Sequence, residues 1–453
     1  MGDGQTLALL GGTPAVTRSA PRVPPIGAAE AQAVQRVLAE ACTGDGSALS
    51  AIAGGGPVRD LEAAFARMVG VRFALALASG TMALEVALRA LGVGLGDEVI
   101  LSPYDWGAAA GAALRLGAIP VFADIDPRTY TLDPASVADR VTPLTKAIVV
   151  THLFGHPAAL EPIREVARRY ELPVIEDCAQ ALGSRYRGRP VGTFGAFGCF
   201  SLGWGKVVTG GEGGILVTNE EGLFEKALFW SQHPLRQLAD AGRVGPLGDL
   251  GPNGRIHPLA AVIASVQLRD LDRRLRSRRA HCEFLSRGLE GIPGIRPVFV
   301  APDCESTYHR YSPTFVPEEV EGIPRDLYIA ALAAEGVPIH RGFIRRPLHW
   351  HPVFRRRSYG RGGWPWRAAG SGRRYRPGDC PVAEARCGAW ELGLDADWEG
   401  ADEAWIEQLL EAFTKVAENL GRLRRIAGSR REGFTLDNYK LSFQNDIEVH
   451  RGR

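Results

Sequence analysis

Short apolar runs alternate with stretches of helical periodicity between residues 73 and 218. Apolar runs of about four to eight residues bounded by turn signals are typical of buried strands, and apolar residues spaced three and four apart indicate helices. Strands that alternate with helices predict a parallel sheet with helices on both faces. The predicted strands are 73–77, 98–102, 119–124, 146–152, 172–177 and 213–218.

Helical patterns flank this block on both sides. Residues 27–40 and 58–70 predict two helices before it, and residues 259–279 predict one long amphipathic helix after it. That helix leads into a second region, whose predicted strands and helices are 295–300, 311–316, 325–336 and 401–420.

These patterns divide the chain into two expected domains. We expect a large α/β domain over 1–275 and a smaller C-terminal α/β domain over 276–430, followed by a tail of uncertain structure over 431–453. Residues 341–378, dense in Arg, Gly, Trp and Pro, predict an irregular surface loop.

Composition excludes several classes of protein. With 453 residues, 45% hydrophobic and 23% charged, the chain is an ordinary globular protein, and its net charge of +2 argues against nucleic acid or a membrane surface as the main partner. Seven scattered cysteines without a C-x-x-C pair indicate neither a metal site nor a disulfide framework. No signal peptide and no run of about 18 apolar residues is evident, so we expect a cytoplasmic protein.

Two nucleotide-binding motifs fail on inspection. The glycines at 92, 94 and 96 have the wrong spacing for a dinucleotide fingerprint and follow a helix. The run from Phe200 to Val207 has Phe where a P-loop needs its first Gly and Val where it needs a hydroxyl.

Lys206 is the lysine best placed for chemistry. It is one of only five lysines, and it follows a short strand within the glycine-rich run CFSLGWGKVVTGGEGG. A lysine that forms a Schiff base must be deprotonated and held beside a bulky ligand, and glycines allow that close approach. The alternative is a surface lysine in a glycine-rich turn.

Acidic and polar residues follow the strand at 172–177. Asp177 ends this strand at its carboxyl edge, where open parallel sheets bind ligands, and a carboxylate there can keep a pyridine nitrogen protonated. Gln180, in the following turn, could reach a ring hydroxyl. The alternative for Asp177 is a helix cap or turn acid.

Three further segments carry candidate ligand contacts. Gly80 and Thr81 join a strand to a helix, which makes an anion site or an ordinary cap, and Ser201 could donate to the same phosphate. Trp106 follows a strand and could stack on a flat ring or simply pack. The loop with Asn253 and Arg255 could contact a phosphate or carboxylate, or cap the next helix.

Together these residues describe one ligand. An anion turn, a stacking aromatic, a strand-end acid and a glycine-embedded lysine occur in order at strand ends of one parallel sheet. The ligand that needs all four is pyridoxal 5′-phosphate (PLP).

The chain resembles the DegT/DnrJ/StrS family of PLP-dependent sugar and aminocyclitol aminotransferases from about Gly11 to Leu423. The segments that carry the resemblance are SGTMALEVALRALGVGLGDEVI, IPVFADIDPRTYTLD, VIEDCAQALGSRYRGRPVGTFGAFGCFS, GGEGGILVT, NGRIHPLAA and CPVAEA. The resemblance implies the fold of fold-type-I PLP enzymes, with a mostly parallel seven-stranded sheet in the large domain.

The resemblance also implies a role for each candidate. Lys206 would form the Schiff base and move the proton, Asp177 would pair with the pyridinium nitrogen, and Gln180 would lie near the ring oxygen. Trp106 matches the aromatic stacked on the ring. The remaining implied contacts are Gly80, Thr81 and Ser201 with the phosphate, Asn253 lent to that phosphate by the neighbouring subunit of a homodimer, and Arg255 near the substrate.

The leading hypothesis is transfer of an amino group from glutamate or glutamine to a nucleotide-linked keto-sugar or to a keto-cyclitol. Pyridoxamine 5′-phosphate would be the form of the cofactor between the two half-reactions. Arginines in 341–378, with His349 and His351, could receive a nucleotide diphosphate, or form a solvated basic loop. Leu202 and the long stretch 355–375 depart from the family pattern and bear on the acceptor. The alternatives are a PLP-dependent dehydratase or aromatising enzyme and a non-catalytic regulatory protein.

Overall fold

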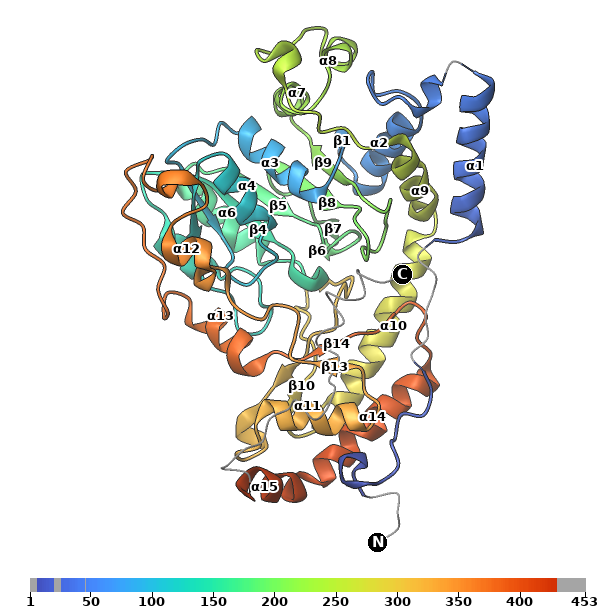
Figure 1. Cartoon of the computed structure of the whole chain (residues 1–453), viewed down its shortest axis with the longest axis vertical. Coiled ribbons are helices and arrows are strands. Elements are labelled where there is room, and N and C mark those ends of the chain that lie inside the picture. The colour runs from blue at the N-terminus through green and yellow to red at the C-terminus, as the bar shows by residue number, and fades with distance from the viewer. Residues whose placement is uncertain (1–5, 20–25, 45, 430–453) are drawn as a thin grey trace.

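A seven-stranded sheet forms the centre of the molecule (Figure 1). The computed structural model describes residues 6–19, 26–44 and 46–429; the tail expected over 431–453 lies outside them. The strand order is β1-β9-β8-β5-β4-β2-β3, and β9 alone runs against the other six. The strands are β1 (Phe73–Leu77), β2 (Glu98–Leu101), β3 (Ile119–Phe122), β4 (Thr145–Thr151), β5 (Val174–Asp177), β8 (Phe197–Ser201) and β9 (Gly214–Thr218).

The predicted α/β class and all six predicted strands are confirmed, and the seventh strand is β8, which precedes Lys206. Alternate residues of each strand face opposite sides of the sheet, because side chains alternate along an extended backbone. In β1, Leu75 and Leu77 enter one hydrophobic core, whereas Ala74 and Ala76 enter the other.

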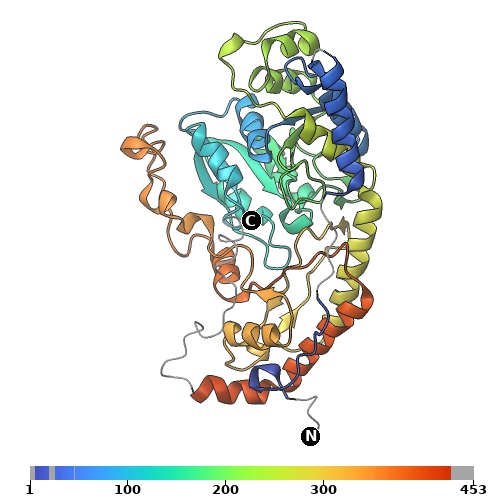
Figure 2. The same cartoon turned by 45° about the vertical axis from the view of Figure 1, so that its right-hand side comes forward.

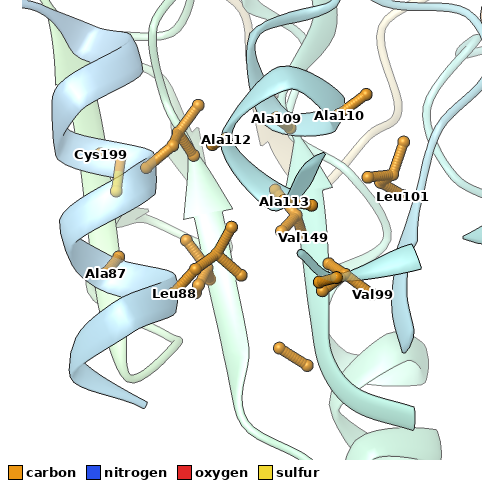
Figure 3. Packing of buried hydrophobic residues seen from close by; sticks show 14 of the residues in the cluster. Ala87, Leu88, Val99, Leu101, Ala109, Ala110, Ala112, Ala113, Val149 and Cys199 are labelled. Carbon is orange, nitrogen blue, oxygen red and sulfur yellow. The ribbon is translucent and has the colours of Figure 1, made fainter. Parts of the chain in front are cut away.

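Helices cover both faces of the sheet. One face is covered by α3 (Gly80–Ala90), α4 (Ala108–Arg115) and α7 (Glu221–Phe229). The other face carries α2 (Gly56–Val69), α5 (Pro134–Arg140), α6 (Leu160–Arg169) and α9 (Pro258–Leu268), with α1 (Ala28–Thr43) outside α9. Figure 3 shows that the inner side of α4 is almost wholly alanine, which lets this helix approach α3 and the strands closely.

The long helix predicted over 259–279 is in fact two helices. α9 ends at Leu268, and α10 (Leu271–Leu289) begins after a turn at residues 269 and 270. There the amide groups of Arg269 and Asp270 bond three residues back rather than four, to Val266 and Gln267. The break separates an apolar helix packed against α1 and α2 from a charged helix that leads to a second core.

The second core is built by the C-terminal helices and by the N-terminal segment (Figure 2). Leu7 and Val16 are buried in it, so residues 6–19 belong to this unit and not to the large domain as expected. Its other elements are α11 (Arg325–Ala334), α14 (Glu403–Glu418), α15 (Leu420–Ser429) and the short pairs β10 (Ile295–Arg296) with β12 (Thr314–Phe315) and β13 (Ile339–His340) with β14 (Gly393–Leu394).

A three-stranded sheet joins the two units. β11 (Cys304–Glu305) pairs with β6 (Arg185–Tyr186), which pairs with β7 (Arg189–Pro190). Two further helices are α8 (Pro234–Ala241), beside α7, and α13 (Pro381–Ala385). In the part of the chain that the structure describes, no helix has the length and apolar character needed to cross a membrane.

The arginine-rich stretch 341–378 is not simply an irregular surface loop. It contains α12 (Pro352–Arg356), and its Trp366 and Tyr375 are buried in the core of the large domain. The hydroxyl of Tyr375 donates to the Pro120 carbonyl of edge strand β3 at 2.8 Å. The stretch therefore covers the open edge of the central sheet, which would otherwise present unpaired backbone groups. Hydrophobic contacts assign residues 344–387 to the large unit rather than to the expected domain 276–430.

Removing the Trp366 indole should loosen this cover. Trp366 is 1% exposed and makes edge contacts with Phe354 and Tyr375. We expect Trp366→Ala to lower the free energy of unfolding by about 3–5 kcal/mol, because it leaves a large cavity. Chemical denaturation measures this loss. Trp350→Ala, in the same stretch at a side chain 37% exposed, is the matched control, and an equal loss there would contradict the account.

Candidate active site

The candidate residues converge on one edge of the central sheet. Because six strands run in the same direction, the carboxyl ends of β1, β2, β4, β5 and β8 share that edge. Gly80 and Trp106 lie just beyond β1 and β2, Asp177 and Ser201 end β5 and β8, and Lys206 follows β8. Ligands bind at this edge in open α/β sheets.

The beginning of α3 packs directly onto the ends of β8 and β9. A Cβ at Gly80 would stand 2.9 Å from the Ser201 Cβ, and one at Gly214 would stand 2.3 Å from the Ser79 carbonyl carbon. The Ser79 hydroxyl caps the helix by accepting from the Met82 amide at 3.0 Å. The amides of Gly80 and Thr81 remain free of partners among the described residues, beside the Ser201 hydroxyl. This arrangement fits a phosphate group.

Asp177 is held by its own turn and by a buried pair beneath it. Its carboxylate accepts from the Ala179 amide at 3.0 Å, and its carbonyl accepts from the His152 amide at 3.0 Å. The Nδ1 atom of His152 accepts from the Ala158 amide, so Nε2 carries the proton and donates to Glu176 at 3.1 Å. Both side chains are completely buried, which fixes the strand end that carries Asp177.

Gln180 follows the end of β5 and Trp106 follows the end of β2, so both residues lie at the carboxyl edge of the sheet. The Gln180 side-chain oxygen accepts from the Phe154 amide at 2.9 Å, which orients its amide nitrogen as the remaining donor. Trp106 is 77% exposed, unusual for so large an apolar group, and is therefore available to stack on a ring. The predicted roles of both residues, near the ring oxygen and on the ring face, remain predictions.

Lys206 is a half-buried amine in the field of two acids. Burial lowers the pKa of Lys206, with Asp177 opposing this shift, Arg310 adding to it and Asp105 opposing it. Lys206 and Asp177 thus lie close enough to influence each other electrostatically. A lysine with a lowered pKa is more often neutral, and only the neutral amine is a nucleophile.

Asp105 is a site residue that the sequence interpretation missed. Its side chain is buried, accepts from the Trp106 amide at 2.7 Å and receives the Thr151 hydroxyl at 2.6 Å. Thr151 is the register partner of Asp177 in the neighbouring strand, so both acids lie over one strand end. Burial and the charge of Asp177 raise the pKa of Asp105 to about 8. The only signal in the sequence was its place directly before Trp106.

Burial also raises the pKa of Asp177, and the Ala179 amide and then Lys206 oppose that shift. Because burial and the charge of Asp177 raise the pKa of Asp105 to about 8, the protonated form of Asp105 is favoured near neutral pH. Asp177 is favoured as the ionised member, because the Ala179 amide and Lys206 stabilise its charge.

His309 and Arg310 also reach the site from the second unit. Burial lowers the pKa of His309 well below its usual value, and the positive charge of Lys206 lowers it further. The segment is held by Thr307, whose hydroxyl donates to the Gln180 carbonyl at 3.2 Å. A Cβ at Gly155, whose φ is +92°, would collide with the Thr307 hydroxyl. No sequence motif pointed to these residues, because only the packing of the two units brings them here.

The loop with Asn253 and Arg255 lies beside the anion turn of its own chain. The Gly254 carbonyl accepts from the Ala78 amide at 2.8 Å, and Arg255 forms a bridge with Leu77. Asn253 is exposed. The action of Asn253 in a neighbouring subunit therefore stays a prediction, since the fold also brings its loop to this chain's own α3.

His349 is not placed to contact a substrate. It is completely buried, and its Nε2 atom lies 2.8 Å from the Glu384 carboxylate. It contacts the ring of Phe122 at the end of β3. The expected substrate role fails here because His349 is part of the packing that attaches residues 344–387 to the sheet.

A mostly parallel sheet with a lysine, a strand-end acid and an anion turn at its carboxyl edge defines an enzyme of the fold-type-I aminotransferase class. Residues 34–365 match the DegT/DnrJ/EryC1/StrS aminotransferase family, and the chain belongs to this family. The chain is therefore an aminotransferase.

The chain is similar to two curated relatives and to one solved structure. It is 38% identical over 378 residues to the L-glutamine:2-deoxy-scyllo-inosose aminotransferase of Streptoalloteichus tenebrarius, covering 78% of this chain and 84% of the relative. It is 35% identical to the enzyme of the same name from Micromonospora echinospora, covering 81% and 87%. The crystal structure of 3-amino-5-hydroxybenzoic acid synthase matches 89% of this chain and 100% of that chain, with a TM-score of 0.73 and 27% identity.

The raised pKa of Asp105 predicts that the stability of the cofactor-free protein depends on pH. Unfolded Asp105 ionises near pH 4, whereas the folded residue keeps its proton to about pH 8. The folded state thus binds more protons between these values, and its stability falls as pH rises through them. We expect Asp105→Asn to gain thermal stability relative to wild type as pH increases from about 4 to about 8.

Thr151→Val tests the same assignment by raising the pKa of Asp105 further. It removes the hydroxyl that donates to the Asp105 carboxylate, so the pKa of Asp105 should rise and the pH window should extend upward. Thermal melts from pH 4 to pH 9 measure both variants. A difference between Asp105→Asn and wild type that is constant across this range would refute the assignment.

Proposed function

We propose that this aminotransferase moves the amino group of L-glutamine to a keto-cyclitol, with PLP as its cofactor. The two curated relatives described above are L-glutamine:2-deoxy-scyllo-inosose aminotransferases. The observation that carries the proposal is the Lys206 amine in the electrostatic field of Asp177, at the edge where α3 and Ser201 form the anion turn. The relatives favour a cyclitol acceptor over a nucleotide-linked sugar.

The residues fit PLP group by group. The free amides at the beginning of α3 and the Ser201 hydroxyl suit its phosphate. A side chain at position 80 would collide with Ser201, so this position requires glycine. Asp177 suits the ring nitrogen, Gln180 the ring oxygen and the exposed Trp106 the ring face. Lys206 would hold the cofactor covalently. When bound, PLP supplies an aldehyde that carries the amino group and a ring that accepts electron density.

Lys206 would act as both amine and proton carrier. Burial favours its neutral form, so its Nζ atom can take the proton that leaves the α-carbon of the donor. The same atom returns a proton in the reverse half-reaction on the acceptor. The nearby cation of Arg310 assists by making a protonated Lys206 less stable.

The two acids would set the charge available to the ring nitrogen of a bound cofactor. Asp177 as a carboxylate would keep the ring nitrogen protonated, which strengthens the ring as an electron acceptor. Asp105, protonated below about pH 8, adds no second negative charge near neutral pH. The proposed site therefore offers one anion for one pyridinium cation.

A homodimer with shared sites forms part of this proposal. Asn253 is exposed, and its side-chain oxygen accepts from the Arg255 amide of its own loop at 3.4 Å. Trp204, two residues before Lys206, is 62% exposed. An apolar side chain that large at the mouth of a site indicates a surface that another subunit covers. The proposal also includes Arg255 near the substrate, because its backbone bridges to Leu77 at the end of β1.

A second candidate is PLP-dependent dehydration or aromatisation of a cyclic substrate. The similarity to 3-amino-5-hydroxybenzoic acid synthase favours it, and Lys206 is compatible with either reaction. Transfer forms one keto acid for each amine installed, whereas elimination consumes no amino donor. This stoichiometry separates the candidates, and absence of either reaction would leave the non-catalytic alternative.

Amino transfer should be measurable directly with 2-deoxy-scyllo-inosose. We expect the purified protein with PLP to convert this ketone and L-glutamine into the amine, with equimolar keto acid detected by mass spectrometry. Lys206→Ala should lower the rate at least about 10³-fold, since general acid–base catalysis contributes about 10²–10⁴-fold and the covalent hold is lost as well. Lys206→Arg, which keeps the charge, should be equally inactive. Retention of wild-type activity in Lys206→Ala would overturn the assignment.

Mixed dimers test whether Asn253 acts in the partner's site. Lys206→Ala and Asn253→Ala should each be inactive alone, yet a hybrid dimer would contain one site with both residues intact. After subunit exchange of equal amounts, we expect about a quarter of the wild-type activity to return. No recovery, in hybrids shown to form by native mass spectrometry, would mean that Asn253 serves its own chain.

A further inference from the structure

The stretch 341–378 concentrates the positive charge of the protein. It contains eleven arginines and no acidic residue, whereas the whole chain carries a net charge of only +2. Arg341 pairs with Asp326 and Arg373 pairs with Glu98. Most of the remaining arginines in the stretch have no acidic partner among the described residues.

Three of these arginines line one groove. The groove encloses about 590 Å³, and its lining residues are Arg356, Arg357, Ser358, Gly362, Gly363, Trp366, Arg367, Gly370 and Ser371. The Arg357 guanidinium donates to the Ser371 carbonyl at 3.0 Å, which fixes its direction. The side chains of Arg356 and Arg367 make no hydrogen bond or ion pair with any residue that the structure describes. No acid contributes to the lining.

The groove lies away from the candidate active site. Trp366 and Tyr375 anchor its stretch to the outside of edge strand β3, and β3 is four strands from β8. At about 4.8 Å per strand, this separation is about 19 Å. A Cβ at Gly96 would stand 3.4 Å from the Cβ of Ala369, which is next to the lining residue Gly370. Gly96 precedes β2 and so lies toward the opposite edge of the sheet from Lys206. Figures 1 and 2 show α12 and the orange segment after it at the left of the large unit, on the side opposite α1.

Three uncompensated cations around one hollow repel each other, and a multiply charged anion would replace that repulsion with attraction. Arginine presents a planar fork of donors that matches phosphate oxygens. The volume suits a small molecule. Trp366 is 1% exposed, so the groove offers no open aromatic face on which a base could stack.

We propose that this groove is a second ligand site, separate from the catalytic edge, which binds a small anion carrying two or more phosphate charges. It recognises the phosphate groups themselves rather than an attached base. The proposal does not depend on the keto-cyclitol assignment, because neither Lys206 nor its neighbours line the groove.

Titration calorimetry of the full chain with inorganic pyrophosphate tests the site. We expect saturable binding of one pyrophosphate per chain that weakens as salt is raised. The double variant Arg356→Gln, Arg367→Gln should weaken binding by about tenfold or more, because hydrogen bonds to charged groups contribute that much. The matched control is Arg355→Gln, Arg361→Gln, which removes the same charge from exposed arginines outside the lining. The control should bind as wild type does.

Each other outcome overturns a stated part of the proposal. Equal weakening in both double variants would mean diffuse surface attraction and no site. Binding of adenosine diphosphate tenfold tighter than pyrophosphate would mean that a base is recognised. Competition between pyrophosphate and the keto-cyclitol would make the groove part of the catalytic site. Both double variants should transfer the amino group as fast as wild type does. If wild type itself shows no amino transfer, that result contradicts the proposed function and leaves the proposal for the groove unaffected.

Discussion

The structure depends on placing an amine and two carboxyl groups together out of water. Lys206, Asp177 and Asp105 come from three different strand ends, and burial opposes the charged form of all three. An isolated charge in such a place would be costly. Here each charge is offset by its neighbours, or is removed when a carboxylate gains a proton or the amine loses one. The result is a lysine whose lowered pKa favours its neutral, nucleophilic form, near two acids of which Asp105 keeps its proton to about pH 8.

The surrounding fold holds these groups in place by close backbone contacts. Gly80 and Gly214 let α3 approach β8 and β9. The His152–Glu176 pair fixes the end of β5 from below. Gly155 admits Thr307, and with it His309 and Arg310 from the second unit. The site is thus completed by parts of the chain that are remote in sequence, and a side chain at any of these glycines would separate them.

The sequence predicted the sheet, the class and the principal site residues because these depend on local patterns. Strand periodicity, glycines around Lys206 and an acid at the end of β5 can all be recognised within about ten residues. It missed Asp105 because an acid after a strand has many uses, and it missed His309 because only packing between units brings that residue to the site. The predicted substrate role of His349 was wrong for a related reason. Its burial against Phe122 and Glu384 arises only when residues 344–387 fold onto the sheet. The same stretch read as a loop because its buried Trp366 and Tyr375 are separated by polar residues without a regular period.

The covalent position of the cofactor tests the central claim most directly. Borohydride reduction of the PLP-loaded protein fixes the cofactor to whichever amine holds it, and peptide mass spectrometry then locates the added mass. The account predicts that the pyridoxyl phosphate mass appears on Lys206 alone. Its appearance on any of the other four lysines, or on no lysine of a fully loaded protein, would contradict the account.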